Sequence, residues 1–340
     1  MQHHSLKLRF RSAMVVVLAE MTAIASPEFA TKNMHHLAAQ IPAIANGSNL
    51  AQVSKNLAAI GATPAEQELI NTWVVIAIAL YHHENLATLP IDLAAASEHD
   101  FADQKPLPIY LPIYKSMAEL ETLVLGLAIA LCCRDRFSPR DFISNCCDYL
   151  GKYVDCLAAQ GASLQTDQLG ITAIDRLDQL FRQLWQKLQL VQKLVNQGQS
   201  ALVARSQLGA NSLCFGLYCL LSTADHPQLV RVRLAQFMDS ADHMEPGDIG
   251  AIGSDDPISM LSPDLTTMAG INVRIGIAAL AAVYNGVILE NESSDQQIMR
   301  SGIEMGDRLL AYWSGVYEPE FNQIDFYPAI TAADLLRRRC

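Results

Sequence analysis

Positive charge is scarce in this sequence, which has 24 Lys and Arg residues against 35 Asp and Glu residues and a net charge of −11. The only basic runs are residues 7–11 and 337–339. Nonspecific binding to nucleic acid requires clustered cations that release counterions, so we expect no nucleic-acid partner. Charged residues of both signs make up only 17% of the chain and hydrophobic residues make up 51%. This balance excludes a disordered scaffold and predicts a globular protein with a large core.

Metal-binding cysteine spacing and membrane-spanning runs are also missing. None of the eight cysteines forms a C-x-x-C pair, so we interpret them as small core side chains in a reducing compartment. The apolar stretch 13–25 follows basic residues as in a signal peptide, but Glu20 interrupts it and no small-x-small cleavage site follows. No run approaches the roughly 18 apolar residues of a membrane span. We therefore expect a soluble, cytoplasmic protein without membrane contact.

Runs typical of β-strands are scarce as well, whereas helical patterns recur along the chain. The clearest is Ile275–Tyr284, which is apolar on every side and built largely from Gly and Ala. A helix of this kind has no face to offer water, so it should be buried all round. We predict an all-α fold, with a single large helical domain over residues 1–340 and this segment near its centre.

Local signals place the other helices. Thr63 and Glu66 form a capping box around Pro64, which predicts a helix from there to about His82. Further helices are expected at residues 8–25, 117–133, 172–196, 211–222, 227–238 and 293–315, and from a Ser138 cap to Gly151. Residues 26–49 are predicted to be loop with one or two short helices, and residues 89–112 a long loop. Residues 172–196 have one apolar seam and a Gln-rich opposite face, which fits either packing within the domain or a subunit interface.

Two polar segments are candidates for chemistry. His82 and His83 precede Glu84, but adjacent residues on a helix point about 100° apart and rarely share one ion. We expect these histidines to act as cations at a helix C-terminus. Residues 239–267 contain six Asp and one Glu and are predicted to form an exposed acidic loop.

Three stretches together resemble the ADP-ribosylglycohydrolase family. Arg9-Phe10-Arg11-Ser12-Ala13-Met14 resembles its opening Arg-Phe-x-Gly-Ala-Leu, residues 213–223 (LCFGLYCLLST) resemble its penultimate helix, and residues 276–286 (GIAALAAVYNG) resemble its closing helix. The order and rough spacing also agree. The resemblance implies the all-α fold of that family, whose active members hydrolyse ADP-ribose linkages with a two-metal site, usually of magnesium or manganese.

The sequence departs from the family at its metal ligands. The aspartates of the family's Gly-Asp-x-Asp-Thr fall on Ala269 and Ile271, and its threonine falls on Asn272. The acid of the opening motif falls on Met21, with Glu20 one place early. No Asp occurs between residues 26 and 68, where a further metal motif is expected. The remaining candidate ligands are Glu20, Asp255, Asp256 and Asp264, and the aspartates among them are also explained as solvated loop carboxylates.

Three functions are compatible with these patterns. The first is a pseudoenzyme of the ADP-ribosylglycohydrolase type that binds a partner or nucleotide and holds no cofactor. The second is an active hydrolase whose Mg or Mn ions are held by displaced ligands, and the third is an unrelated helical interaction scaffold. Enzymatic activity therefore stays open. We expect a protein partner or a homo-oligomer, bound through the acidic residues 239–264 or the Gln-rich face of residues 172–196.

Overall fold

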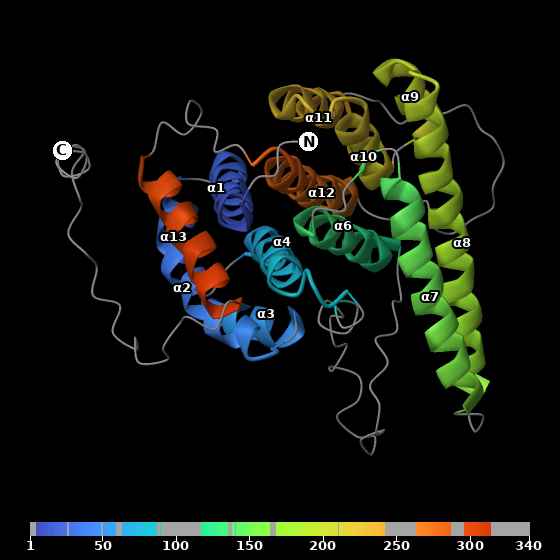
Figure 1. The fold of residues 1–340 in the computed structure, drawn as a ribbon, viewed down its shortest axis with the longest axis horizontal. Coiled ribbons are helices and arrows are strands. Elements are labelled where there is room, and N and C mark those ends of the chain that lie inside the picture. Colours follow the sequence, from blue (N-terminus) through green and yellow to red (C-terminus); the bar gives the residue numbers. More distant parts are fainter. Residues whose placement is uncertain are drawn as a thin grey trace.

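The structure is a computed structural model that describes residues 5–25, 27–48, 50–58, 63–86, 89, 117–134, 138–139, 141–163, 168–209, 211–241, 263–286 and 296–313. Within these residues every regular element is a helix (Figure 1), which confirms the all-α class. The helices are α1 (Leu6–Ile24), α2 (Pro27–Ala45), α3 (Leu50–Ala58), α4 (Pro64–Tyr81), α6 (Met117–Cys133), α7 (Phe142–Ser163), α8 (Gln168–Asn196), α9 (Ala201–Leu208), α10 (Ser212–Ser222), α11 (Pro227–Ala241), α12 (Pro263–Asn285) and α13 (Gln296–Trp313).

Helix α12 lies at the centre of the fold, packed against α1, α4, α6, α10 and α11 (Figure 1). Every side chain of residues 275–283 is buried, so the predicted central helix is confirmed. Glycines allow the neighbours to come close. A Cβ atom on Gly276 would lie 2.1 Å from Leu125 Cδ2 of α6, and one on Gly216 of α10 would lie 2.8 Å from Ile277 Cγ1. The small residues of the sequence pattern are thus needed for close packing.

Helices α1 and α13 form an extensive pair on one side of α12, where α13 also contacts α2 and α4. Gly302 and Gly306 of α13 face the backbone of α1, and a Cβ atom on Gly302 would lie 2.5 Å from the Val15 Cα atom. At the edge of this contact, Arg11 donates through Nε and Nη2 to the carboxylate of Asp307, at 2.7 and 2.6 Å. The two helices therefore meet nearly backbone to backbone.

Helices α7 and α8 form a long pair on the other side of the molecule (Figure 1). The predicted seam of α8 turns inward, since Leu184, Leu188 and Val191 are fully buried. In its described part the seam therefore packs within the chain. The polar face of α8 is exposed and carries Gln179, Gln183, Gln186 and Gln189.

The prediction of loop for residues 26–49 is wrong, because α2 is one 19-residue helix. Met34, Leu37, Ile41 and Ile44 recur at spacings of three and four and are buried, which is the periodicity of an amphipathic helix. Pro42 lies in the last turn of α2. Few helical residues follow it, so its effect on the helix is small. The prolines in this stretch therefore did not prevent a regular helix.

Two predicted helix ends also differ from the structure. Helix α7 passes through Gly151 and continues to Ser163. A glycine inside a helix costs only about 1 kcal/mol relative to alanine, which does not end a helix held by packing. Both ends of the predicted acidic loop at 239–267 are helical, since α11 extends to Ala241 and α12 begins at Pro263. Residues 242–262, and most of the predicted loop at 89–112, lie outside the described residues.

His83 does not fulfil the expectation of a cation at the end of α4. Its side chain is only 2% exposed, its Nδ1 lies 2.7 Å from the Leu80 carbonyl oxygen, and its ring contacts the rings of Phe10 and Trp313. Burial lowers the pKa of His83 below its usual value. A neutral imidazole that donates to the end of its own helix replaces the predicted charge.

Arg9 is a buried cation in this region, with a side chain that is 6% exposed. Its Nη1 donates to the carbonyl oxygens of Cys132 and Cys133, at 2.8 and 3.1 Å. These carbonyls end α6, where a helix has unsatisfied acceptors and a negative dipole end. Arg9 therefore fastens the first helix to the end of α6.

Candidate functional site

Among the four candidate ligands Glu20, Asp255, Asp256 and Asp264, the structure describes the side chain of Glu20. It lies near the C-terminal end of α1 and its side chain is 1% exposed. Arg231 of α11 donates to Oε1 through Nε at 2.8 Å and through Nη2 at 2.7 Å. Arg274 of α12 donates to Oε2 through Nε and Nη2, both at 3.1 Å. Three helices thus meet at one carboxylate, which we call the Glu20 cluster.

The local sequence explains how the cluster forms. Helix α1 is apolar and buried over residues 13–18, so Glu20, which follows this run, also lies in the interior. Close packing at Gly276 fixes α12 against α6 and places Arg274 beside the end of α1. Helix α11 begins at Pro227, which suits a first helical position, and Arg231 follows about one turn later.

The electrostatics of the cluster follow from burial and helix polarity. An ionised carboxylate in the interior is costly unless it is paired, and a negative charge near a helix C-terminus is also unfavourable. The two guanidinium groups compensate both effects. The side chains of Arg231 and Arg274 are 23% and 28% exposed, so the positive side of the cluster reaches solvent.

A second polar contact lies on the neighbouring part of α12. Asn272 Nδ2 donates to Oε2 of Glu68 in α4 at 3.0 Å. Its Oδ1 is buried and has no hydrogen-bond partner among the described residues. Asn272 occupies the position that the family resemblance gives to a threonine, so this end of α12 keeps polar groups even where the expected acids are absent.

The structure places the other predicted ligands as follows. Met21, which follows Glu20 in the sequence, is buried, with 1% of its surface exposed. Asp264 lies at the start of α12, but its side chain is outside the described residues, as are those of Ala269 and Ile271. Asp255 and Asp256 also lie outside them. Within the described part of the chain, no group of three or more His, Cys, Asp or Glu side chains is arranged to hold a metal ion.

Arg231 and Arg274 were not predicted as site residues. A signal for Arg274 was available, because it is the only charged residue between positions 270 and 284. A lone charge in a helix that is otherwise apolar requires a partner within the core. Nothing local to Arg231 distinguishes it from the nearby Arg233, since its role depends on a contact with a residue 211 positions away.

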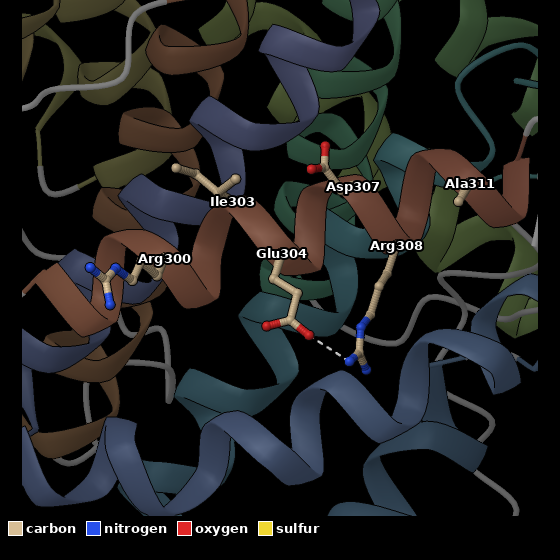
Figure 2. A pocket seen from close by; sticks show the side chains of 6 residues that line it. All are labelled: Arg300, Ile303, Glu304, Asp307, Arg308 and Ala311. Atoms are coloured by element: carbon tan, nitrogen blue, oxygen red, sulfur yellow. Dashed lines mark hydrogen bonds and ion pairs between the residues drawn. The ribbon is translucent and has the colours of Figure 1, made fainter. Parts of the chain in front are cut away.

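A hollow of 420 Å³ lies along α13 and is the other candidate site. Figure 2 shows the six side chains that line it, all from this helix: Arg300, Ile303, Glu304, Asp307, Arg308 and Ala311. Glu304 accepts from Arg308 Nη2 at 2.5 Å, and Asp307 accepts from Arg11. These carboxylates are already paired. The six side chains come from one helix and do not surround a ligand from several sides, so the Glu20 cluster is the stronger candidate.

Comparisons of the chain with protein-family models, with curated proteins and with solved structures found no match. No helix in the described part of the chain combines the length and the apolar character that a membrane span requires. The case for a function therefore depends on the geometry of the Glu20 cluster and on the sequence patterns.

Proposed function

We propose that the protein is a catalytically degenerate member of the ADP-ribosylglycohydrolase type, which acts by binding a protein partner or a nucleotide instead of by hydrolysis. The observation that carries this proposal is the pairing of Glu20 with Arg231 and Arg274. Glu20 is the acid closest to the position that the resemblance assigns to a metal ligand of the opening motif. In this protein that acid is engaged by two cationic side chains.

The pairing argues against a metal ion at the same carboxylate. Hard divalent cations need several oxygen ligands whose lone pairs point at the metal. Both oxygens of Glu20 instead accept hydrogen bonds from guanidinium groups, at 2.7 to 3.1 Å. An approaching cation would have to displace both arginines and would be repelled by their charge. The thioether of Met21 next to it is a poor ligand for magnesium or manganese.

Titration calorimetry with manganese tests the proposal. We expect no stoichiometric binding of two ions and no hydrolysis of ADP-ribosylated substrates. A variant with Glu20 changed to Gln is the matched control, because it keeps the size of the side chain and should leave this result unchanged. Tight binding of two ions that is lost in Asp255→Ala or Asp264→Ala would instead establish the alternative, an active hydrolase with displaced ligands.

An interaction scaffold is a second candidate, favoured by the exposed face of α8. Trp185 lies on this Gln-rich face and is 43% exposed, and tryptophan is enriched at the centres of protein interfaces. If the face binds a second copy, sedimentation should detect a dimer that Trp185→Ser dissociates. Leu202→Ser on α9 is the control, since Leu202 is also exposed, at 78%. A monomer at all concentrations would contradict self-association.

The acidic residues 239–264 are the other proposed contact region for a partner. An anionic segment attracts a basic partner over a distance, and added salt screens that attraction. Capture of partners from cytosol should therefore weaken at high ionic strength and when Asp255 and Asp256 are changed to Asn. Retention of the same partners under all these conditions would argue against the segment as a docking site.

A further inference from the structure

We propose that Asn46 is a site of spontaneous covalent modification, at which the side-chain amide is lost as ammonia and the end of α2 is released. The sequence contains two Asn-Gly pairs, at residues 46–47 and 285–286. This dipeptide is prone to deamidation, because glycine has no Cβ atom to hinder attack by its backbone nitrogen. The structure gives the two pairs opposite surroundings. The inference is independent of the Glu20 cluster and of any ligand.

The reaction requires only the chain and water. The backbone nitrogen of Gly47 forms a bond to the side-chain carbonyl carbon, Cγ, of Asn46. The bond from Cγ to the amide nitrogen breaks, and that nitrogen leaves as ammonia with the proton of the Gly47 N–H group. Water then opens the cyclic succinimide at one of its two carbonyl carbons, which leaves aspartate or isoaspartate at position 46.

The first pair is accessible to this reaction. Asn46 and Gly47 are both exposed at the C-terminal end of α2. The Asn46 side chain makes no hydrogen bond to the residues that the structure describes, so nothing among them holds its amide group in place. A Cβ atom on Gly47 would have nothing within 4 Å, so the backbone there has room to change its conformation.

The folded turn restrains the reaction through its backbone. Gly47 N donates to the Ile44 carbonyl oxygen at 3.0 Å, and Ser48 N donates to that of Ala43 at 2.9 Å. Gly47 has a φ of 83°, and these two bonds form a Schellman motif. The bond from Gly47 N must break before this nitrogen can attack Cγ. Deamidation therefore proceeds from a state in which the end of α2 has opened.

The second pair is held much more firmly, at the end of α12. Asn285 Nδ2 donates to the carbonyl oxygens of Ala224 and Ala281, both at 2.9 Å, which fixes the amide group. Gly286 is buried, and its N donates to the Ala282 carbonyl oxygen at 2.8 Å. Attack at this pair requires the end of the central helix to leave the core, and openings of this kind approach the free energy of global unfolding.

Deamidation at position 46 prevents the turn from closing as before. The new carboxylate lies at the C-terminus of α2, where the helix dipole is negative. Isoaspartate also adds a carbon atom to the backbone, so the two hydrogen bonds of the Schellman motif cannot re-form in the same geometry. The neighbouring Ala45 carbonyl oxygen accepts from Tyr81 Oη at 3.2 Å. The contact between the ends of α2 and α4 should therefore weaken first.

Peptide mapping by mass spectrometry tests the inference on the full chain, incubated in native buffer and in urea. In urea, both Asn-Gly pairs should react at similar rates. In the folded chain, we expect position 46 to react within about tenfold of its rate in urea, because helix ends open at little cost, and position 285 to be slowed about a hundredfold or more. Reaction at position 46 no faster than at 285 in the folded chain, or a difference in urea as large as in native buffer, would overturn the inference.

Tyr81→Phe tests whether opening of α2 controls the rate. It removes the hydrogen bond to Ala45 and should accelerate reaction at position 46 about fivefold, which corresponds to about 1 kcal/mol, while position 285 is unaffected. Tyr149→Phe on α7 is the matched control and should change neither rate. An unchanged rate at position 46 in Tyr81→Phe, or equal acceleration at both positions, would refute control of the reaction by the end of α2.

Discussion

Gly306 of α13 lies directly against the backbone of Arg11 in α1, where an added Cβ atom would come within 2.8 Å of the Arg11 Cα atom. Real Cβ contacts are not this short, so an alanine would force the two helices apart. We expect Gly306→Ala and Gly302→Ala each to lower the free energy of unfolding by about 1–3 kcal/mol, although alanine is the better helix former. Urea unfolding measures the effect.

Gly151 provides the control for this pair. It lies inside α7, and a Cβ atom there would have nothing within 4 Å. Gly151→Ala should therefore raise stability by up to about 1 kcal/mol, through helix propensity alone. Equal effects at Gly151 and Gly306 would contradict the close approach of α1 and α13.

Ala279 tests the packing around the central helix. It is fully buried in α12, so a leucine there has no free volume to occupy. Ala279→Leu should destabilise the protein by about 1–3 kcal/mol, and Ala282→Leu should act in the same direction. Gln186→Leu on the exposed face of α8 is the control, with an effect within about 0.5 kcal/mol. A thermal melting curve unchanged by Ala279→Leu would refute the burial of this helix.

His83 should make stability depend on pH. Burial lowers its pKa in the folded protein, whereas the unfolded chain has the ordinary value of about 6.5. Between these two values the unfolded state binds more protons, so the free energy of unfolding should fall as pH drops below about 6.5. The charged groups near the ring are Glu84, which opposes the shift, and Arg9 and Arg134, which add to it.

A variant isolates this contribution. His83→Asn keeps a donor that can reach the Leu80 carbonyl oxygen but cannot be protonated in this range. It should flatten the dependence of the urea midpoint on pH between 8 and 5, whereas replacement of the exposed His226 by Asn serves as the control. An unchanged slope in His83→Asn would show that other groups cause the acid sensitivity.

The buried cysteines should resist alkylation in the folded protein. Burial raises the pKa of Cys147 to about 11 and those of Cys214 and Cys219 to about 12. The thiolate is the reactive form, so both low access and low ionisation slow the reaction. Iodoacetamide at pH 8 followed by mass spectrometry should label these three only after denaturation. Rapid labelling of Cys219 in the native protein would reveal an opening of α10.

Local interactions made much of the fold predictable from the sequence. The capping box at the start of α4 is present as expected, with Glu66 N donating to Thr63 Oγ1 and Thr63 N donating to the Glu66 carboxylate. It depends on residues only three apart. The burial of Ile275–Val283 was predictable because a helix that is apolar on every side has no polar face to expose to water. The cysteines whose side chains the structure describes are buried, as their interpretation as core side chains required.

The candidate site was less predictable because it depends on long-range contacts. Glu20 was a candidate metal ligand because it lies one place before the position that the family resemblance gives to an acid. Its partners, Arg231 and Arg274, lie 211 and 254 positions away, and no pattern within either helix points to Glu20. The neutral state of His83 was also not predictable from local sequence, because it depends on burial by the distant residues Phe10 and Trp313. The aspartates at 255 and 256 remain predictions outside the described residues.

The pairing of α1 with α13 also constrains how the chain is made. Arg11 and Asp307 are 296 positions apart, so the apolar surface of α1 that receives Gly302 and Gly306 is synthesised long before the helix that covers it. Contacts this distant in sequence slow folding, and exposed apolar surface promotes aggregation in the meantime. A nascent chain that still lacks α13 therefore exposes the apolar face of α1 that α13 later covers.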